Sequence, residues 1–399
     1  MDPRRNPYAP GAGTPPPELA GRDELIERAA VALDRIRAGR PARSFILYGL
    51  RGVGKTVLLN RIRLDAEARG FSTIRIEALE DRPLPALLIP NMRALLLRLD
   101  RGEAAKVVAG RAWRALAGFA KSFKAKVGDI EVSLDVDAEP GLADSGDLEL
   151  DLADLFAAVG AVVRDRKSAA VLFIDELQYV REGELAALIG ALHRAAQDGL
   201  PVTMVAAGLP QLLGQMGRAK SYAERLFEFV PIDRLPDAAA RDALKLPAER
   251  EFVYFDEAAI DSILRETQGY PYFLQEWGKH CWQIADESPI SRAHADRATL
   301  EALAELDASF FRVRFDRLTP REKAYMAAMA ALGPGPHRSG DIAEKLGKAV
   351  SAVAPLRNSL IAKGMIYSPA HGDTAFTVPL FDAFMKRVAP ARAEQDSKP

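Results

Sequence analysis

Short apolar runs and longer helical patterns alternate along the first 235 residues. The apolar runs lie at 45–48, 71–76, 169–174, 202–208 and 229–232. Between them, apolar residues recur every three or four positions, the spacing of helices with one buried face. Continuous apolar runs that alternate with helices are typical of a parallel sheet covered on both sides. The pattern therefore predicts an α/β fold with a parallel sheet.

The pattern changes at residue 236, after which only helical periodicity continues, to about residue 306. From residue 318 the chain predicts three helices, at 323–331, 339–346 and 349–363, followed by a hairpin over 364–378. Three helices and a hairpin form a winged helix-turn-helix. We therefore expect a proline-rich arm over 1–20, an α/β domain over 21–235 with an insertion at about 100–150, an all-helical unit over 236–306, a winged helix over 318–390 and a tail over 391–399.

Two segments interrupt this pattern. Residues 1–17 hold six prolines, which exclude a helix or an inner strand and predict a flexible arm. Residues 111–126 carry five cations and no acid, whereas 129–154 carry ten acids and no Lys or Arg. Within the acidic segment, 130–136 alternates like a strand. The simpler interpretation is a solvated insertion with a hairpin; the alternative is an acidic insert that docks on a basic surface of the same protein or a partner.

The first apolar run leads into a glycine-rich loop that fits G-x-x-x-x-G-K-[ST] at every fixed position. This is a Walker A motif, or phosphate-binding loop. Its backbone N–H groups, the positive end of the following helix and a lysine ammonium point at one anion. Thr56 is placed to bind the Mg²⁺ that bridges the β- and γ-phosphates. The residues assigned to the nucleotide in this loop are Gly49, Gly52, Val53, Gly54, Lys55, Thr56 and Val57.

The third apolar run ends in two carboxylates, Asp175 and Glu176, as a Walker B motif does. The carboxyl end of a central strand delivers both side chains to the edge of the sheet where ligands bind. We expect Asp175 to hold the Mg²⁺, largely through water, and Glu176 to polarise the attacking water. An acidic helix cap after a core strand is the alternative.

Composition excludes several classes of protein. The net charge is −1, so any affinity for nucleic acid has to come from a local patch. The only cysteine, Cys281, excludes an internal disulfide framework and a multi-cysteine zinc site. No apolar run approaches the length of a membrane span and no leader opens the chain. We expect a cytoplasmic protein with no membrane partner.

The order of these features resembles the AAA+ ATPases related to origin-recognition and archaeal initiator proteins, a group that grades into the STAND signalling class. The resemblance rests on the segment 21–24, the Walker A and B residues, the Gly-x-Pro at 269–271 and the C-terminal winged helix. It implies an ATP- and Mg²⁺-dependent ATPase in which the helical unit is a lid. Arg22 then lies near the adenine, Pro271 is a lid contact, and the proline arm folds across the nucleotide.

Two departures from that family predict slow turnover. The strand at 202–208 ends in Ala206, Ala207 and Gly208, without the Asn or Thr that often senses the γ-phosphate. The lid helix that follows Gly269 lacks the usual arginine, because Tyr272, Phe273 and Leu274 fill its first turn. Both gaps are typical of switch-like members.

Outside the motifs, the functional assignments remain open. Arg225 is either a structural ion-pairing residue or one that reaches the γ-phosphate of a neighbouring subunit in a homo-oligomer. The residues expected near DNA phosphates or bases are Lys348, Ser351, Arg357 and Lys363, with His371 at the wing tip. The favoured function is an ATP-driven DNA-binding switch. The rival is a STAND-like signalling or defence ATPase whose winged helix binds a protein or inhibits the ATPase; a small-molecule kinase is disfavoured because no substrate-binding insert is recognisable.

Overall fold

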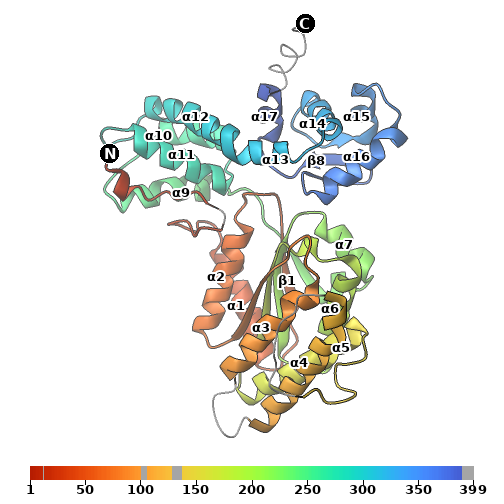
Figure 1. Cartoon of the computed structure of the whole chain (residues 1–399). Coiled ribbons are helices and arrows are strands. Elements are labelled where there is room, and N and C mark those ends of the chain that lie inside the picture. Colours follow the sequence, from red (N-terminus) through yellow and green to blue (C-terminus); the bar gives the residue numbers. More distant parts are fainter. Residues whose placement is uncertain (12, 100–105, 128–136, 389–399) are drawn as a thin grey trace.

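The computed structural model describes residues 1–11, 13–99, 106–127 and 137–388. Figure 1 shows a sheet wrapped by helices at the bottom and two mainly helical units side by side above it. The unit at upper left contains α9 to α12, and the unit at upper right contains α14 to α17. We call the first the lid and the second the C-terminal unit. Helix α13 lies between them.

The central sheet has five parallel strands in the order β2-β3-β4-β1-β5. Its middle strands are apolar and buried on both faces, which requires helices on both sides. The parallel α/β fold predicted from the sequence is thus confirmed. The strands are β1 (Ser44–Tyr48), β2 (Ser72–Glu77), β3 (Ala170–Asp175), β4 (Val202–Gly208) and β5 (Phe227–Pro231).

Two separate hydrophobic cores cover the two faces of this sheet. One contains side chains of α1 (Asp23–Arg37) and α2 (Lys55–Ala68) and includes Leu33, Leu58 and Phe173. The other contains side chains of α3 (Leu84–Leu99), α4 (Lys106–Val127), α5 (Leu148–Asp165) and α6 (Glu182–Gln197) and includes Phe156 and Leu172. Short elements complete the domain, namely η3 (Leu177–Tyr179), α7 (Leu212–Ala219) and α8 (Ala223–Leu226).

The acidic segment is only partly the insertion that the sequence suggested. Helix α5 begins at Leu148, inside the acidic segment, and Asp147 caps its N-terminus by accepting from the Leu150 N–H at 3.0 Å. The carboxylate of Asp151 is buried and accepts from the N–H and hydroxyl of Ser145. Acids in a first helical turn are favourable because they face the positive end of the helix dipole. The strand predicted at 130–136 lies outside the described residues.

The lid contains α9 (Asp237–Glu249), α10 (Glu257–Thr267), α11 (Pro271–Ile284) and α12 (Arg292–Leu306). A π-helical turn, η4 (Asp307–Phe311), then leads into α13 (Arg312–Asp316).

The C-terminal unit has the predicted three helices and hairpin, plus two elements that the sequence did not indicate. Its helices are α14 (Pro320–Leu332), α15 (Ser339–Lys345) and α16 (Val350–Ala362), and its hairpin is β7 (Ile366–Tyr367) with β8 (Asp373–Phe376). The additional elements are β6 (His337–Arg338), which pairs with β8, and α17 (Phe381–Val388).

The lid and the C-terminal unit share one continuous core. Phe273 of the lid contacts Phe311 of the π-helical turn, and the Phe311 ring stacks on Phe384 of α17 with centroids 5.2 Å apart. Phe381 packs edge-on against Phe311. No polar layer separates the two units within this aromatic chain, so packing favours their movement as one body.

The prediction of a flexible proline arm was wrong for the described part of residues 1–17. Tyr8 is buried against Gly278 of the lid, and its hydroxyl donates to the Leu244 carbonyl. The Trp282 indole N–H donates to the Asp2 carbonyl at 2.9 Å, and Pro3–Arg5 form one turn of 3-10 helix. Proline at the first position of a turn loses no hydrogen bond, so proline content did not exclude this turn. The arm is a fixed part of the lid.

Candidate nucleotide site

The phosphate loop has the backbone geometry that its glycines allow. A Cβ on Gly49 would lie 1.9 Å from the Ile232 carbonyl oxygen, so only glycine permits this approach of β1 to the chain after β5. Gly54 has φ 88°, a left-handed conformation, and is the N-cap of α2. The N-terminus of α2 therefore starts at Lys55 and carries free N–H groups and a positive dipole, which together favour an anion.

Lys55 is buried beneath this loop. Its Nζ donates to the Leu50 carbonyl at 2.7 Å. Burial lowers the pKa of Lys55 to about 8, and the positive charge of Arg51 acts in the same direction, while Glu176 and Asp175 oppose them. Because the two carboxylates do not offset the cost of burying the Lys55 charge, an anion that binds in the loop would stabilise the protonated ammonium.

The metal-site prediction places Thr56 and Asp175 together, and the structure does so. The Thr56 side chain hydrogen-bonds to the Asp175 carboxylate, which lies at the carboxyl end of β3. Burial raises the pKa of Asp175 despite this bond. A hydroxyl and a carboxylate are hard oxygen ligands of the kind Mg²⁺ prefers, and a divalent cation would stabilise the ionised carboxylate. The residues present therefore fit Mg²⁺.

Glu176 is held in a strained conformation at the same edge of the sheet. Its φ is 52°, in the left-handed region that non-glycine residues seldom adopt. Its carboxylate accepts from the Gln178 side-chain amide and lies 3.8 Å from an Arg51 guanidinium nitrogen. Strain of this kind concentrates at functional sites, where surrounding contacts maintain it.

Strand β4 ends without a polar side chain, and Gln178 supplies a polar group at that end of the strand. Its side-chain oxygen accepts from the Leu209 N–H at 3.0 Å, directly after Gly208, while its amide donates to Glu176. Gln178 thus connects the end of β4 with Glu176. No sequence motif marks Gln178 for this role; the available signal is a polar residue two positions after the Walker B glutamate.

A cavity of about 440 Å³ lies over these groups, within the size range of small-molecule sites. Its walls include Lys55, Asp175 and Glu176 from the sheet domain, Pro271 and Tyr272 from the lid, and residues 9–11, 13, 14 and 16 of the arm. Arg22 also lines it and donates to the Asp233 carbonyl at 2.6 Å. Burial lowers the pKa of Arg22. The cavity thus brings together Arg22, Pro271 and the arm, which the sequence analysis assigned to the nucleotide on resemblance.

Both upper units contact the phosphate loop through the backbone. The Tyr272 N–H, at the start of lid helix α11, donates to the Gly52 carbonyl at 3.1 Å. The Arg51 N–H donates to the carbonyl of Thr377, in the C-terminal unit, at 2.9 Å. Adjacent residues of the loop, Arg51 and Gly52, are therefore hydrogen-bonded to two different parts of the chain, the C-terminal unit and the lid.

The residues predicted to contact DNA divide into two groups. Lys348, Ser351 and His371 are exposed. Arg357 donates instead to the Thr374 hydroxyl, at 2.9 Å, and to the Asp373 carbonyl, at 3.0 Å. Lys363 is paired with the buried Glu322 carboxylate at 2.8 Å. The last two side chains hold α16 in place within the C-terminal unit.

Arg225 lies away from the cavity of its own chain. It is exposed on α8, immediately before the edge strand β5. An exposed position at the edge of the sheet is compatible with either role predicted for it.

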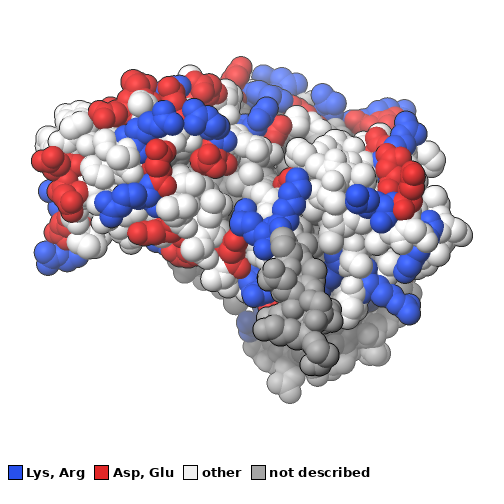
Figure 2. Space-filling model, turned by 90° about the horizontal axis from the view of Figure 1, so that it is seen from above, with Lys and Arg blue, Asp and Glu red and all other residues white. Residues whose placement is uncertain are grey.

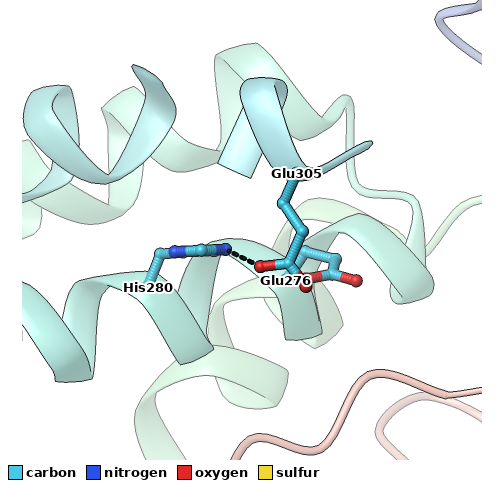
Figure 3. A group of neighbouring side chains, drawn as sticks. All are labelled: Glu276, His280 and Glu305. Atoms are coloured by element: carbon cyan, nitrogen blue, oxygen red, sulfur yellow. Dashed lines mark ion pairs between the residues drawn. The ribbon is translucent and has the colours of Figure 1, made fainter. Parts of the chain in front are cut away.

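A cluster of Glu276, His280 and Glu305 in the lid has the side chains of a metal site, and their ligand atoms lie within 4.8 Å of one another (Figure 3). His280 and Glu276 come from α11 and Glu305 from α12, with His280 Nε2 3.0 Å from a Glu305 oxygen. Lys279 Nζ already lies 2.7 and 2.8 Å from the two Glu305 oxygens. The protein thus supplies its own cation there, and the cluster joins two lid helices.

Comparison with known families identifies the sheet domain. Residues 18–205 match a family model described as "AAA ATPase domain", and residues 308–385 match one described as "Domain of unknown function (DUF8462)". The N-terminal part of the chain is therefore an AAA+ P-loop ATPase domain. No curated protein matches the sequence. None of the helices in the described part of the chain is both long and apolar enough to cross a bilayer.

The chain is also similar to solved structures. It matches the Walker-type ATPase PABY2304 of Pyrococcus abyssi at 16% identity and TM-score 0.60, over 94% of this chain and 97% of that one. It matches Aeropyrum pernix Orc1, in complex with DNA, at 16% identity and TM-score 0.46, over 95% of each chain. It matches the Thermotoga maritima RuvB Holliday junction branch migration motor at 15% and 0.45, over 89% and 92%. The first similarity supports the fold, and the two lower scores support nothing further.

Proposed function

We propose that this protein is an ATP-driven switch that binds ATP with Mg²⁺, hydrolyses it slowly and binds DNA through its C-terminal unit, a winged helix. The observation that carries the proposal is Arg51. Its N–H bonds to Thr377 of the C-terminal unit, while its guanidinium approaches Glu176, the residue we assign to the attacking water. A change at the phosphates therefore reaches the C-terminal unit through one residue.

In this function the loop residues bind the phosphates and Lys55 neutralises them. Asp175 and Thr56 would hold Mg²⁺, which supplies charge neutralisation at the β- and γ-phosphates. The Glu176 carboxylate accepts from Gln178 and lies 3.8 Å from Arg51, so these contacts compete with a water for its orientation. That competition is consistent with slow turnover.

The enzymatic part is tested by comparing two Glu→Gln variants. Glu176→Gln should still bind ATP and should lose turnover on the order of 100-fold, the usual scale for a positioned acid–base group. Glu182→Gln, which alters an exposed carboxylate at the start of α6, should leave both unchanged. Wild-type turnover in Glu176→Gln would remove Glu176 from the mechanism.

DNA binding is tested by gel shift at several salt concentrations. Because phosphate contacts release counterions, affinity should fall steeply as salt rises. Lys348→Glu should weaken binding, whereas Lys121→Glu, an equally exposed position on α4, should not. Binding that is absent at every salt concentration would contradict this half of the proposal.

A second function is favoured by the surroundings of α16. Two of its predicted DNA contacts are bound internally, and its C-terminal end, with Ile361 and Ala362, lines a cleft of about 1180 Å³ that faces the ATPase domain. On the face seen in Figure 2, basic and acidic side chains are mixed across the two upper units. These observations support a STAND-like ATPase in which the winged helix binds a protein or holds the ATPase inactive. Absence of DNA binding together with faster turnover in Ala362→Glu would select it.

A further inference from the structure

An arginine outside both Walker motifs reaches the nucleotide cavity. Arg314 lies on α13, directly after the π-helical turn, and lines the cavity together with Lys55 and Glu176. π-helical turns interrupt the regular spacing of a helix and are frequent at functional sites. Here the turn leads into α13, which connects the lid to the C-terminal unit, so Arg314 lies on the connecting helix.

The Arg314 side chain is partly buried, and its guanidinium has no paired carboxylate among the described residues. It stacks over the Phe310 ring at 4.1 Å and donates to the Phe310 carbonyl at 2.5 Å. Burial, together with the nearby charge of Arg51, lowers the pKa of Arg314 to about 10. A charge that is partly removed from water is stabilised by an opposite charge beside it. In a cavity that binds a polyphosphate, the ligand supplies that charge.

The position of Arg314 within the cavity indicates which phosphate it meets. Arg314 lines the nucleotide cavity with Arg51 and Glu176 and lines a second, smaller cavity with Arg51, so it lies toward the end of the site where water is to attack. A guanidinium can bind two phosphate oxygens at once, which suits a terminal phosphate with three free oxygens. We propose, on the basis of the function proposed above, that Arg314 binds the terminal phosphate of ATP and that ADP leaves it without a partner.

This contact would supply a cation that the lid helix lacks. The first turn of α11 carries Tyr272, Phe273 and Leu274, and its Tyr272 ring stacks on Phe310, the residue that also supports Arg314. Because α13 connects to α14, a pull on Arg314 by the terminal phosphate acts directly on the C-terminal unit. Arg314 is thus a second route, beside Arg51, from nucleotide to output.

The test compares the affinities of full-length variants for a non-hydrolysable ATP analogue and for ADP by calorimetry. Arg314→Gln should lower affinity for the analogue roughly 10- to 100-fold, the range of one or two charge-assisted hydrogen bonds, and change ADP affinity little. Arg314→Lys, which keeps the charge, should recover part of the loss. Arg312→Gln, at an exposed position on the same helix, should bind both nucleotides normally.

Equal losses for the analogue and ADP in Arg314→Gln would show a packing role and overturn the inference, as would no loss for either. Arg314→Met, which keeps an apolar stem over Phe310, checks this and should reproduce the selective loss. Lys55→Ala separates the two levels. If Lys55→Ala binds nucleotide as the wild type does, the proposed function itself fails; if only Arg314→Gln behaves as wild type, only the role of Arg314 fails.

Discussion

The sheet domain and the two upper units are stabilised in different ways. The sheet domain keeps two cores, one on each face of the sheet, and its functional side chains stand at strand ends. The lid and the C-terminal unit share one core that runs through Phe273, Phe311 and Phe384. This difference implies that the upper units respond together, and that a lid closing on nucleotide also displaces the C-terminal unit.

The largest expected effect comes from cutting the shared core. Phe311 is fully buried, so Phe311→Ala should destabilise the protein by about 3–5 kcal/mol. Hydrogen exchange should rise in both upper units at once and leave the strands of the sheet protected. Phe252→Ala, at a side chain that is 79% exposed, should have little effect. Exchange that rises in the C-terminal unit alone would show that the two units are independent.

A smaller effect is expected at the buried Glu322 carboxylate inside the C-terminal unit, which is paired with Lys363. Burial alone would raise the pKa of Glu322, but hydrogen bonds from Lys363, from the Thr319 N–H and from Ser359 outweigh it and lower the pKa to about 2. The ionised carboxylate therefore stabilises the fold above the unfolded pKa of about 4.5, and that stability is lost as the pH falls toward 2.

At pH 7, Glu322→Gln should reduce the free energy of unfolding by about 2–3 kcal/mol. At pH 3.5 the gap between wild type and variant should narrow by about 1.4 kcal/mol, because the unfolded carboxyl is by then largely protonated. Denaturant titrations at the two pH values measure both quantities. A gap that does not change with pH would show that the folded protein does not stabilise the ionised Glu322 carboxylate as described.

The smallest effect concerns the sheet domain, where the charge of Lys55 depends on its burial. With a pKa of about 8, Lys55 loses its proton as the pH rises from 7 to 9, so nucleotide affinity should fall by up to about 10-fold. The sign follows because the anionic phosphates bind the protonated form. Arg51→Gln removes a neighbouring positive charge and should move the midpoint to higher pH. Calorimetric titrations across this range would contradict the assignment if affinity stayed flat.

The sheet domain could be predicted in detail because its signals are local. Strand β4 begins and ends where its apolar run does, at Val202 and Gly208, and the Walker residues follow from fixed spacing. Burial and backbone geometry act there on short segments. Lys55, Asp175 and Glu176, which line the cavity, could therefore be predicted from sequence motifs without any knowledge of tertiary contacts.

For the upper units, the individual helices and strands could be predicted, but the contacts between them could not. Their helices follow from periodicity, but nothing local shows that Arg357 and Lys363 point inward, since the partners Asp373 and Glu322 lie 16 and 41 residues away. The same holds for Tyr8, whose burial depends on a helix more than 230 residues later in the chain. Arg314 was missed for that reason: no spacing rule connects it with Lys55.

The two hydrogen bonds that attach the upper units to the phosphate loop are backbone–backbone bonds, from the Tyr272 N–H to the Gly52 carbonyl and from the Arg51 N–H to the Thr377 carbonyl. Such bonds do not depend on side-chain chemistry, so alanine substitution at residues 51, 272 and 377 would leave them in place. Related chains could keep them while those three residues change; Gly52 is constrained by its φ of 81°. Only a change in the backbone itself, such as proline at position 51 or 272, removes a donor. The connection between nucleotide and output could therefore persist through extensive sequence divergence.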